Sequence, residues 1–417
     1  MNIVIEIIVS VASICSVAFD VQNEPLSVCP SISQWMHCLD ESIKNRPLTW
    51  LAIPGSHNTF AFQFFENEAY AAVTKVKNLT KTKEYANIFS PDLSPDTVSM
   101  LSFASFFQGK SYTRDVIGNW SLCQHWNLQE QLDNGIRYLD LRVAWNMYSD
   151  QPNFVHGLWG PDVFDSLTSF ANDYLPKHEH EIYLLDFNHF YGMNYPKHVK
   201  LAKFLLSTFG NRIATQTQWK TPNNMTVLSL QKAKQQIVIF YHELGYIQFI
   251  ARGAFWSGAT IPSPWPNTEN EEEMLHSLEN VARSHETDRL NFGREYFIVY
   301  QAILTPSALT IVSNFGDPKR SLRTVLAENA TKTFIEHWLP HVVMHHETNQ
   351  SLPLRLTTTT SRNMVQTTSH LHRDEPPLNS TLDSHFYLGT FNIFIADFIE
   401  AASFPQKIVQ LNEIFNV

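Results

Sequence analysis

Short apolar runs that end in polar side chains recur along the first half of the chain. Residues 51–60 are apolar up to a break at Pro54-Gly55 and then present His57 and Asn58. Three later stretches repeat this arrangement: 135–143 with Asp140 and Arg142, 153–160 with His156, and 182–189 with Asp186 and Asn188. Runs this short, followed by loop residues, predict buried strands. Barrels of alternating strands and helices build active sites at the carboxyl ends of their strands, so we expect these four stretches to form one site.

The rest of the chain alternates between strand-like and helix-like spacing. Further strands are predicted at 236–240, 296–303 and 392–396, and helices at 31–45, 124–134, 163–175, 197–209, 269–288 and 322–339, with a closing helix from residue 405. The acidic helix at 269–288 is expected to be exposed. Seven or eight strands separated mostly by helices are typical of the α/β class. We therefore predict a distorted TIM-type (β/α) barrel in a single domain, residues 19–417.

Two segments depart from this alternation. Residues 61–116 are polar and aromatic without a long period, which predicts an elaborated loop with short helices over the site. Residues 345–384 are polar, with four consecutive threonines at 357–360, which predicts an exposed insertion in the barrel domain.

The overall composition mainly excludes classes of function. The 417 residues are 44% hydrophobic, which is ample for a large core. The formal charge of −10 argues against a nucleic-acid partner and against a polybasic membrane-surface role. An anionic substrate would therefore have to be bound by specific residues.

The N-terminal segment, residues 1–18, is apolar, with small residues at Ser16 and Ala18 placed as at a signal-peptidase site. It is too short to span a membrane, so we predict a secretory signal peptide. Six Asn-X-Ser/Thr sequons point the same way; they are at Asn78, Asn119, Asn224, Asn329, Asn349 and Asn379. We expect a secreted, extracellular glycoprotein.

Outside the predicted signal peptide the chain has three cysteines, Cys29, Cys38 and Cys123. An extracellular protein can form a disulfide between two of them, and proximity favours Cys29 with Cys38. The alternative is three buried free thiols.

The two histidines that follow separate strands, His57 and His156, suit general acid and general base catalysis because imidazole titrates near neutral pH. The chain has 18 histidines, and most of them are expected to be ordinary loop residues. Asp140 and Arg142 lie two apart on one strand and therefore share a face. They form either an internal ion pair or a phosphate site in which Asp140 aims the guanidinium of Arg142.

Four ordered motifs carry a family resemblance: Gly55-Ser-His-Asn58, Gly135-Ile-Arg-Tyr-Leu-Asp-Leu-Arg142, Val155-His-Gly157 and Leu184-Leu-Asp-Phe-Asn-His-Phe190. Together they resemble the X-region of phosphatidylinositol-specific phospholipases C, most closely the small animal proteins called PI-PLC X domain-containing proteins. The resemblance extends from about residue 35 to 409. No segment resembles the other modules of the large signalling enzymes.

The resemblance implies cleavage of an inositol phospholipid, in particular phosphatidylinositol, in two steps through a cyclic phosphate. His57 would take the proton of the inositol 2-hydroxyl, and His156 would protonate the diacylglycerol oxygen that leaves. Ring opening by water would exchange these roles.

The residue at position 142, an arginine in this chain, indicates whether the reaction requires a metal ion. Calcium-dependent members carry a second acidic residue at this position, whereas the metal-independent bacterial members carry an arginine. We therefore predict no cofactor and no metal, with the guanidinium supplying the positive charge. Calcium is not favoured, although Asn58, Asp140 and Asp186 align with other calcium-ligand positions.

The chain also departs from the bacterial pattern, which has an aspartate after the first histidine where this chain has Asn58. From its position alone, at the end of the last predicted strand, Asp397 is expected to orient His57. Asp186 is interpreted as a ligand, a polar contact to inositol or a structural residue. The aromatic loop 255–266 either packs on the barrel or makes a transient contact with a membrane surface.

Two classes of function compete. The first is a secreted phosphoric diester hydrolase that resembles phospholipase C, with His57, His156, Arg142 and Asp140 in the reaction. The second is a secreted protein on the same scaffold that binds lipid or inositol phosphate and has little or no turnover. Another lipid phosphodiesterase on this barrel fits less well, because those families use acidic metal-ligand clusters.

Overall fold

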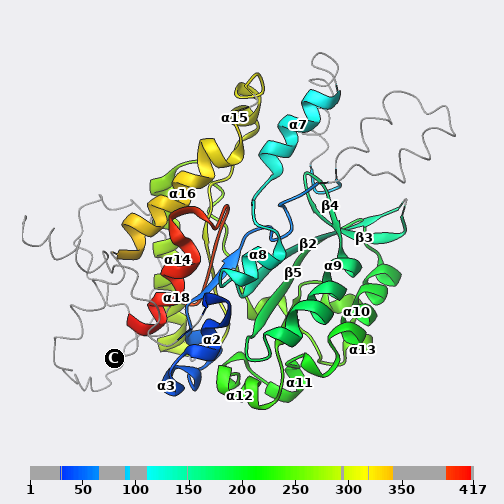
Figure 1. Cartoon of the computed structure of the whole chain (residues 1–417), viewed down its shortest axis with the longest axis vertical. Coiled ribbons are helices and arrows are strands. Elements are labelled where there is room, and N and C mark those ends of the chain that lie inside the picture. Colours follow the sequence, from blue (N-terminus) through cyan, green and yellow to red (C-terminus); the bar gives the residue numbers. More distant parts are fainter. Residues whose placement is uncertain are drawn as a thin grey trace, which may run out of the picture.

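A curled sheet of parallel strands forms the centre of the computed structural model, which describes residues 29, 31–64, 90–93, 110–147, 149–292, 295–317, 319–340 and 391–414. The parallel strands follow the spatial order β7-β6-β5-β2-β1-β9-β8. Their bounds are β1 Ile53–Ser56, β2 Tyr138–Asn146, β5 Tyr183–Tyr191, β6 Ile237–Tyr241, β7 Trp256–Ser257, β8 Val299–Ala302 and β9 Ile393–Ala396. Helices lie between successive strands and cover the outside of the sheet (Figure 1).

The two edges of this sheet are joined by backbone hydrogen bonds. Phe297 N donates to Thr260 O at 2.9 Å, and Val299 N donates to Pro262 O at 3.0 Å. The two donors are two residues apart, and so are the two acceptors. This spacing is that of hydrogen bonds between parallel strands. Pro262 has no N–H to donate in return, so no regular strand forms there. The chain is thus an α/β protein with a distorted TIM-type barrel, and the predicted fold class is confirmed.

One predicted barrel strand is wrong. The segment around 154–155 belongs to β3 (Gln151–His156), which pairs antiparallel with both β2 and β4 (Leu158–Asp162). Only four residues separate β2 from β3, whereas a parallel return needs a crossover of about a dozen or more residues. His156 therefore reaches the site from a hairpin that projects beyond the barrel.

The helices that surround the barrel have the following bounds: α2 Trp35–Cys38, α3 Glu41–Lys44, α7 Lys110–Ser121, α8 Leu128–Asp133, α9 Val163–Ser169, α10 Tyr195–Phe209, α11 Gln216–Trp219, α12 Val227–Lys232, α13 Gln248–Ala251, α14 Glu271–Phe292, α15 Ala308–Ser313, α16 Glu328–Thr333 and α18 Phe404–Ile414.

Alternate residues of β2 belong to two different hydrophobic clusters. Leu139 and Leu141 of β2 belong to the cluster that contains helix residues, and Tyr138 packs in the second cluster with Ile53 and Ile393.

Two helix predictions need correction. The predicted helix 31–45 is broken into short helical turns, α2 and α3 among them, with Cys29 joined to Cys38 by the expected disulfide. Helix α14 was expected to be exposed, but Met274, Leu278 and Ala282 are buried at a spacing of four residues. This spacing places them on one face, so α14 covers the barrel beside β8 with an apolar stripe.

A buried ion pair fixes the N-terminal helical turns to the barrel. Arg137 Nη2 lies 2.6 Å from Glu181 Oε2, and both side chains are almost fully buried. Glu181 also accepts from the backbone N–H groups of Met36 and His37 on α2. The loss of either partner would leave an uncompensated buried charge.

Helices α7 and α15 stand at the top of the molecule in Figure 1. Helix α7 begins within the segment 61–116, which was predicted as an elaborated loop, and extends beyond it. Residues 65–89 and 94–109 of that segment fall outside the described residues. The predicted signal peptide 1–18 and insertion 345–384 also fall outside them. Among the described helices, none combines the length and the apolar character that a membrane crossing requires.

Candidate active site

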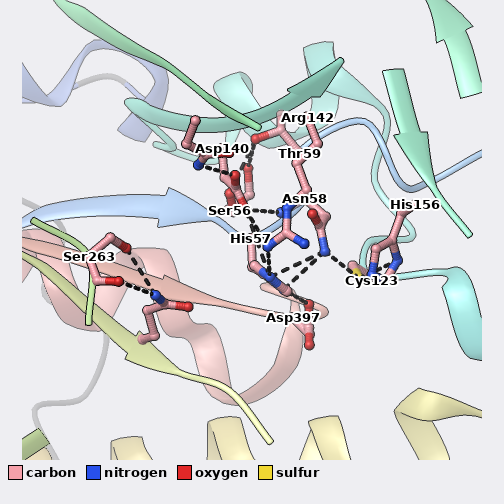
Figure 2. A network of polar contacts seen from close by, with 12 residues as sticks. Ser56, His57, Asn58, Thr59, Cys123, Asp140, Arg142, His156, Ser263 and Asp397 are labelled. Atoms are coloured by element: carbon pink, nitrogen blue, oxygen red, sulfur yellow. Dashed lines mark hydrogen bonds and ion pairs between the residues drawn. The ribbon is translucent and has the colours of Figure 1, made fainter. Parts of the chain in front are cut away.

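The register of two neighbouring strands brings His57 next to Asp397. Strands β1 and β9 pair with Ser56 opposite Ala396, so the following residues are neighbours at the carboxyl end of the sheet. His57 Nδ1 lies 2.7 Å from Asp397 Oδ1, and both side chains are buried (Figure 2). Gln124 donates to the backbone carbonyls of His57 and Ala396 at 2.8 and 3.0 Å and so fastens the two strand ends together. Sequence reasoning missed Gln124.

The partners of His57 determine its tautomer. A carboxylate only accepts hydrogen bonds, so the Asp397 contact places the proton of neutral His57 on Nδ1. Arg142 Nη2 lies 3.0 Å from His57 Nε2 and donates to it. The Nε2 lone pair therefore faces the guanidinium, which is the arrangement of a base next to a group that binds phosphate.

Asp140 and Arg142 emerge on the same side of β2, as their spacing predicts. Arg142 Nη2 lies 3.7 Å from Asp140 Oδ2. Asp140 also accepts from the backbone N–H of Asn58 at 2.8 Å and from Asn188 Nδ2 at 2.6 Å. Burial on its own would raise the pKa of Asp140, but Arg142, His57 and these hydrogen bonds lower the pKa to about 2. Asp140 is therefore a fixed anion behind the guanidinium.

His156 faces His57 across the site. The two ring centroids are 6.4 Å apart, and the rings are inclined by 72°. His156 Nδ1 lies 2.7 Å from the carbonyl oxygen of Ser121, which only accepts, so Nδ1 carries a proton and Nε2 is the atom free for proton transfer. Burial lowers the pKa of His156, and the positive charge of Arg142 lowers it further.

Cys123 lies between the two histidines and was not predicted to be part of the site. Its Sγ accepts from Asn58 Nδ2 at 3.3 Å and lies 3.4 Å from His156 Nδ1 (Figure 2). Burial raises the pKa of Cys123 well above its ordinary value, so the side chain is a neutral thiol. His57, Cys123 and Asp397 could together offer ligand atoms to a metal ion, since these atoms lie within 4.8 Å of one another. In the protein as described, the imidazole is instead hydrogen-bonded to the carboxylate.

Asp186 belongs to a second polar network at the side of the site. It accepts from Tyr138 Oη at 2.7 Å and lies 2.9 Å from His242 Nε2. Burial would lower the pKa of His242, but the hydrogen bond and the charge of Asp186 raise it overall. The His242 ring fits because residue 258 is glycine: a Cβ there would approach the ring to 2.6 Å. Sequence reasoning missed His242, which lies just beyond the end of β6.

Two of the three positions that align with calcium ligands, Asp140 and Asp186, already have protein partners, whereas the buried Oδ1 of Asn58 has none among the described residues. Both oxygens of Asp140 and both oxygens of Asp186 accept hydrogen bonds from the chain. The guanidinium of Arg142 lies beside Asp140, where it would repel a second cation.

The site contains a cavity of about 680 Å³, which is within the usual size range of small-molecule sites. The polar part of the lining includes His57, Asp140, Arg142, His156 and Asp397. The apolar part of the lining comes from α7, from α15 and from the segments that follow β8 and α15. It includes Ile117, Trp120, Leu304, Ile311 and Leu322. The cavity therefore offers a charged floor and an apolar wall to one ligand.

The aromatic residues of the loop 255–266 differ in burial: two pack in the barrel and one faces solvent. Phe255 and Trp256 are fully buried in the barrel. Trp265 is 55% exposed, lines the same cavity and donates from Nε1 to Thr305 Oγ1 at 2.9 Å. Of the three aromatic residues in this loop, only Trp265 is thus available for contact with a surface.

Comparisons with known proteins agree with this architecture. The family described as "Phosphatidylinositol-specific phospholipase C, X domain" matches residues 106–243. PI-PLC X domain-containing protein 2 of Mus musculus is 33% identical, over 67% of this chain and 71% of its own. PI-PLC X domain-containing protein 3 of the same species is 28% identical, over 92% and 94%.

Among solved structures, the phosphatidylinositol-specific phospholipase C from Listeria monocytogenes covers 92% of this chain and 98% of its own, at 13% identity and a TM-score of 0.47. That likeness is too weak for a comparison of individual residues. The similarity to the X domain-containing proteins is strong enough to assign the family. The chain is a member of the PI-PLC X domain-containing protein family, built on a phospholipase C-like scaffold.

Proposed function

We propose that this protein is a phosphoric diester hydrolase that cleaves an inositol phospholipid, phosphatidylinositol in the first instance, without a metal ion. The observation that carries the proposal is the pair of imidazoles, 6.4 Å apart between centroids, beside one guanidinium in one cavity. In each ring Nδ1 is hydrogen-bonded to a carboxylate or carbonyl oxygen, and Nε2 has no such hydrogen bond. Proton transfer works over about 2.6–3.2 Å, so both rings are within reach of opposite oxygens of a single phosphate.

In the first step, Arg142 donates to a phosphate oxygen in place of His57 Nε2. The inositol 2-hydroxyl oxygen attacks phosphorus while its proton passes to His57 Nε2. The bond from phosphorus to the diacylglycerol oxygen breaks, and that oxygen takes the proton from Nε2 of protonated His156. The products are diacylglycerol and a cyclic inositol phosphate, and the histidines have exchanged protonation states.

In the second step, His156 Nε2 takes a proton from water as the water oxygen attacks phosphorus. The bond to the 2-oxygen breaks, and His57 returns its proton to that oxygen. Throughout, Asp397 lies 2.7 Å from Nδ1 of His57 and stabilises the imidazolium formed in the first step. Among the described residues Arg142 Nε has no hydrogen-bond partner, so a phosphate acceptor would satisfy it.

The substrate class follows from the two parts of the cavity. Polar groups that suit hydroxyls, including Tyr138, His242 and Gln301, line one side. Gln301 Nε2 donates to the backbone and side chain of Ser263 at 2.9 and 3.0 Å, which fixes its amide plane. The apolar wall suits a glycerol backbone with its acyl chains, and exposed Trp265 suits transient contact with the membrane that presents them.

The metal-free mechanism is supported by the positions of the charges. Arg142 places a permanent cation next to His57, where the developing charge of the phosphate would lie. The four carboxylate oxygens of Asp140 and Asp186 are engaged by donors from the chain. A calcium ion would have to displace these donors and accept the guanidinium as a neighbour.

The decisive experiment incubates the purified chain with phosphatidylinositol, with and without EDTA, and follows cyclic inositol phosphate by ³¹P NMR. We expect turnover in EDTA, and a loss of at least about 10²-fold in both His57→Ala and His156→Ala. The matched control is His337→Ala, which removes an exposed histidine of the helical segment after α16. Absence of turnover in wild type would refute the proposal.

A binding protein without turnover is the second candidate. It is favoured by the partner of His156, which is the backbone carbonyl of Ser121 instead of a carboxylate, and by Asn58 at the position after His57. Phosphatidylinositol vesicles that retain the wild-type protein but yield no inositol phosphate would support this candidate.

We further propose secretion and N-glycosylation. Of the sequons in the described part of the chain, Asn224 and Asn329 are exposed. Recovery of the protein from culture medium, with a mobility shift on removal of N-glycans, tests both points. Retention in the cells with unchanged mobility would contradict them.

A further inference from the structure

The turn that carries His156 is held by a separate piece of chain, residues 90–93. Gly157 N donates to Asp92 Oδ2 at 2.8 Å, and Ser90 N donates to Gly157 O at 3.1 Å. Both backbone polar groups of Gly157 are thus bonded to the same four-residue segment. The Ser90 hydroxyl donates to the other carboxylate oxygen of Asp92, so the carboxylate is itself fixed in orientation.

The conformation and packing of the turn require glycine at position 157. Gly157 has a φ of +67°, and a Cβ there would lie 2.5 Å from Ser121 Oγ. Ser121 also accepts from the His156 ring through its carbonyl oxygen. The imidazole is therefore held directly by the end of α7, and the turn that carries it is held by the Asp92 segment.

The charged and titratable groups around His156 come from four elements. They are Arg142 on β2, His57 after β1, Cys123 after α7 and Asp92 in the segment 90–93. Cys123 is a neutral thiol, and Arg142 and a protonated His57 repel a second imidazolium. Asp92 is the acidic member of this described set, and it lines the same cavity.

We propose that Asp92 is the positioning residue of His156: it fixes the Gly157 turn through a hydrogen bond and supplies the negative charge that favours the protonated ring. The proposal rests on the function proposed above, in which His156 is the general acid. Asp92 thus supplies a negative charge near His156. Asn58, the residue after His57, is neutral and cannot supply one. The carboxylate comes from a segment 35 residues after His57 along the chain.

The test compares Asp92→Asn with Asp92→Ala in the full chain. Asn keeps an oxygen that can accept from Gly157 N but removes the charge. We expect the alkaline limb of kcat/KM to move to lower pH by about 0.5–1 unit, because His156 loses its proton more readily. Ala also removes the hydrogen bond, so turnover should fall further and at every pH.

The matched control is Asp162→Asn. Asp162 also accepts a backbone N–H, that of Asp165 at 2.9 Å, and does so at the start of α9, away from the cavity lining. Its pH profile should equal that of wild type. If Asp92→Asn lowers activity uniformly while the limb stays in place, Asp92 only supports the scaffold and the proposal is overturned.

A second measurement separates this proposal from the proposed function. The His156 ring is titrated by NMR in wild type and Asp92→Asn, with His156→Gln used to assign its signal. A fall in its pKa of about 0.5–1 unit supports the coupling even if no lipid is cleaved. A change below about 0.1 unit overturns it even if the enzyme is active.

Discussion

Replacement of Asp397 by asparagine is a sharp test of the site, because it removes one charge and leaves the shape unchanged. The carboxylate lies 2.7 Å from His57 Nδ1, and both side chains are buried, so water has little access to replace it. The asparagine amide can face the ring in two ways. With its carbonyl toward Nδ1, the tautomer of His57 survives and only the charge is lost. With its NH2 group toward Nδ1, the ring proton must move to Nε2.

The two orientations differ in cost. Loss of a charged hydrogen bond costs about 1.5–3 kcal/mol, which corresponds to about a 10- to 150-fold change in rate. The second orientation also removes the lone pair that takes the substrate proton, and turns an N–H toward Arg142 Nη2, which is 3.0 Å away. The analogous tautomer switch in a serine protease triad lowers kcat about 10⁴-fold. We expect kcat to fall between about 10-fold and 10⁴-fold, with KM changed by less than about threefold.

The assay measures inositol phosphate released from phosphatidylinositol in mixed micelles over a range of lipid concentrations, which separates kcat from KM. Circular dichroism and a thermal melt establish that the variant is folded. Glu336→Gln, an exposed carboxylate in the helical segment after α16, is the isosteric control. If Asp397→Asn keeps kcat within about twofold of wild type while His57→Ala is inactive, Asp397 has no part in catalysis and the reasoning is wrong.

Three further predictions concern charge and stability. Arg142→Lys keeps a positive charge but loses the planar fork, so kcat/KM should fall about 10²-fold, and equal activity would refute a fixed guanidinium role. Burial and Arg142 lower the pKa of His156 from 6.5, and a general acid must be protonated, so kcat/KM should fall as the pH rises through a value below 6.5; a profile flat to pH 8 contradicts this. Glu181→Gln leaves Arg137 as an uncompensated buried charge and should lower the free energy of unfolding by about 3–5 kcal/mol in denaturant melts. Exposed Glu179→Gln is its control, and equal stability of the two variants would contradict the argument.

The part of the site that could be predicted from the sequence is the part that lies on or directly after parallel strands. Asp140 and Arg142 follow the alternation of strand residues, whereas His57 and Asp397 directly follow strands. The register of β1, β2 and β9 brings the four side chains together. Strand periodicity is local and strong, so positions at strand ends can be read from the order of residues alone.

The remaining parts depend on how loops fold back over the barrel. The interval between β2 and β3 is too short for a crossover, and this feature of the sequence could have predicted the hairpin that carries His156. Cys123 and Gln124 follow α7, and Asp92 lies in a segment with no regular period, so no local pattern marked them. His242 follows β6 directly, and the strand-end argument applied to β6 would have found it.

The two histidines have different hydrogen-bond partners, and this difference supports the roles proposed for them. His57 Nδ1 is 2.7 Å from the carboxylate of Asp397, and its Nε2 is 3.8 Å from that of Asp140, so two carboxylates lie beside the ring. His156 has a backbone carbonyl at Nδ1, and burial and the charge of Arg142 lower its pKa overall, although the charge of Asp92 opposes them. A group that gains a proton readily serves as the base, and one that releases it readily serves as the acid. This difference supports His57 as the base of the proposed first step and His156 as the acid. An exchange of their partners, with a carboxylate moved from position 397 to the side of His156, would be expected to favour the reverse direction of transfer.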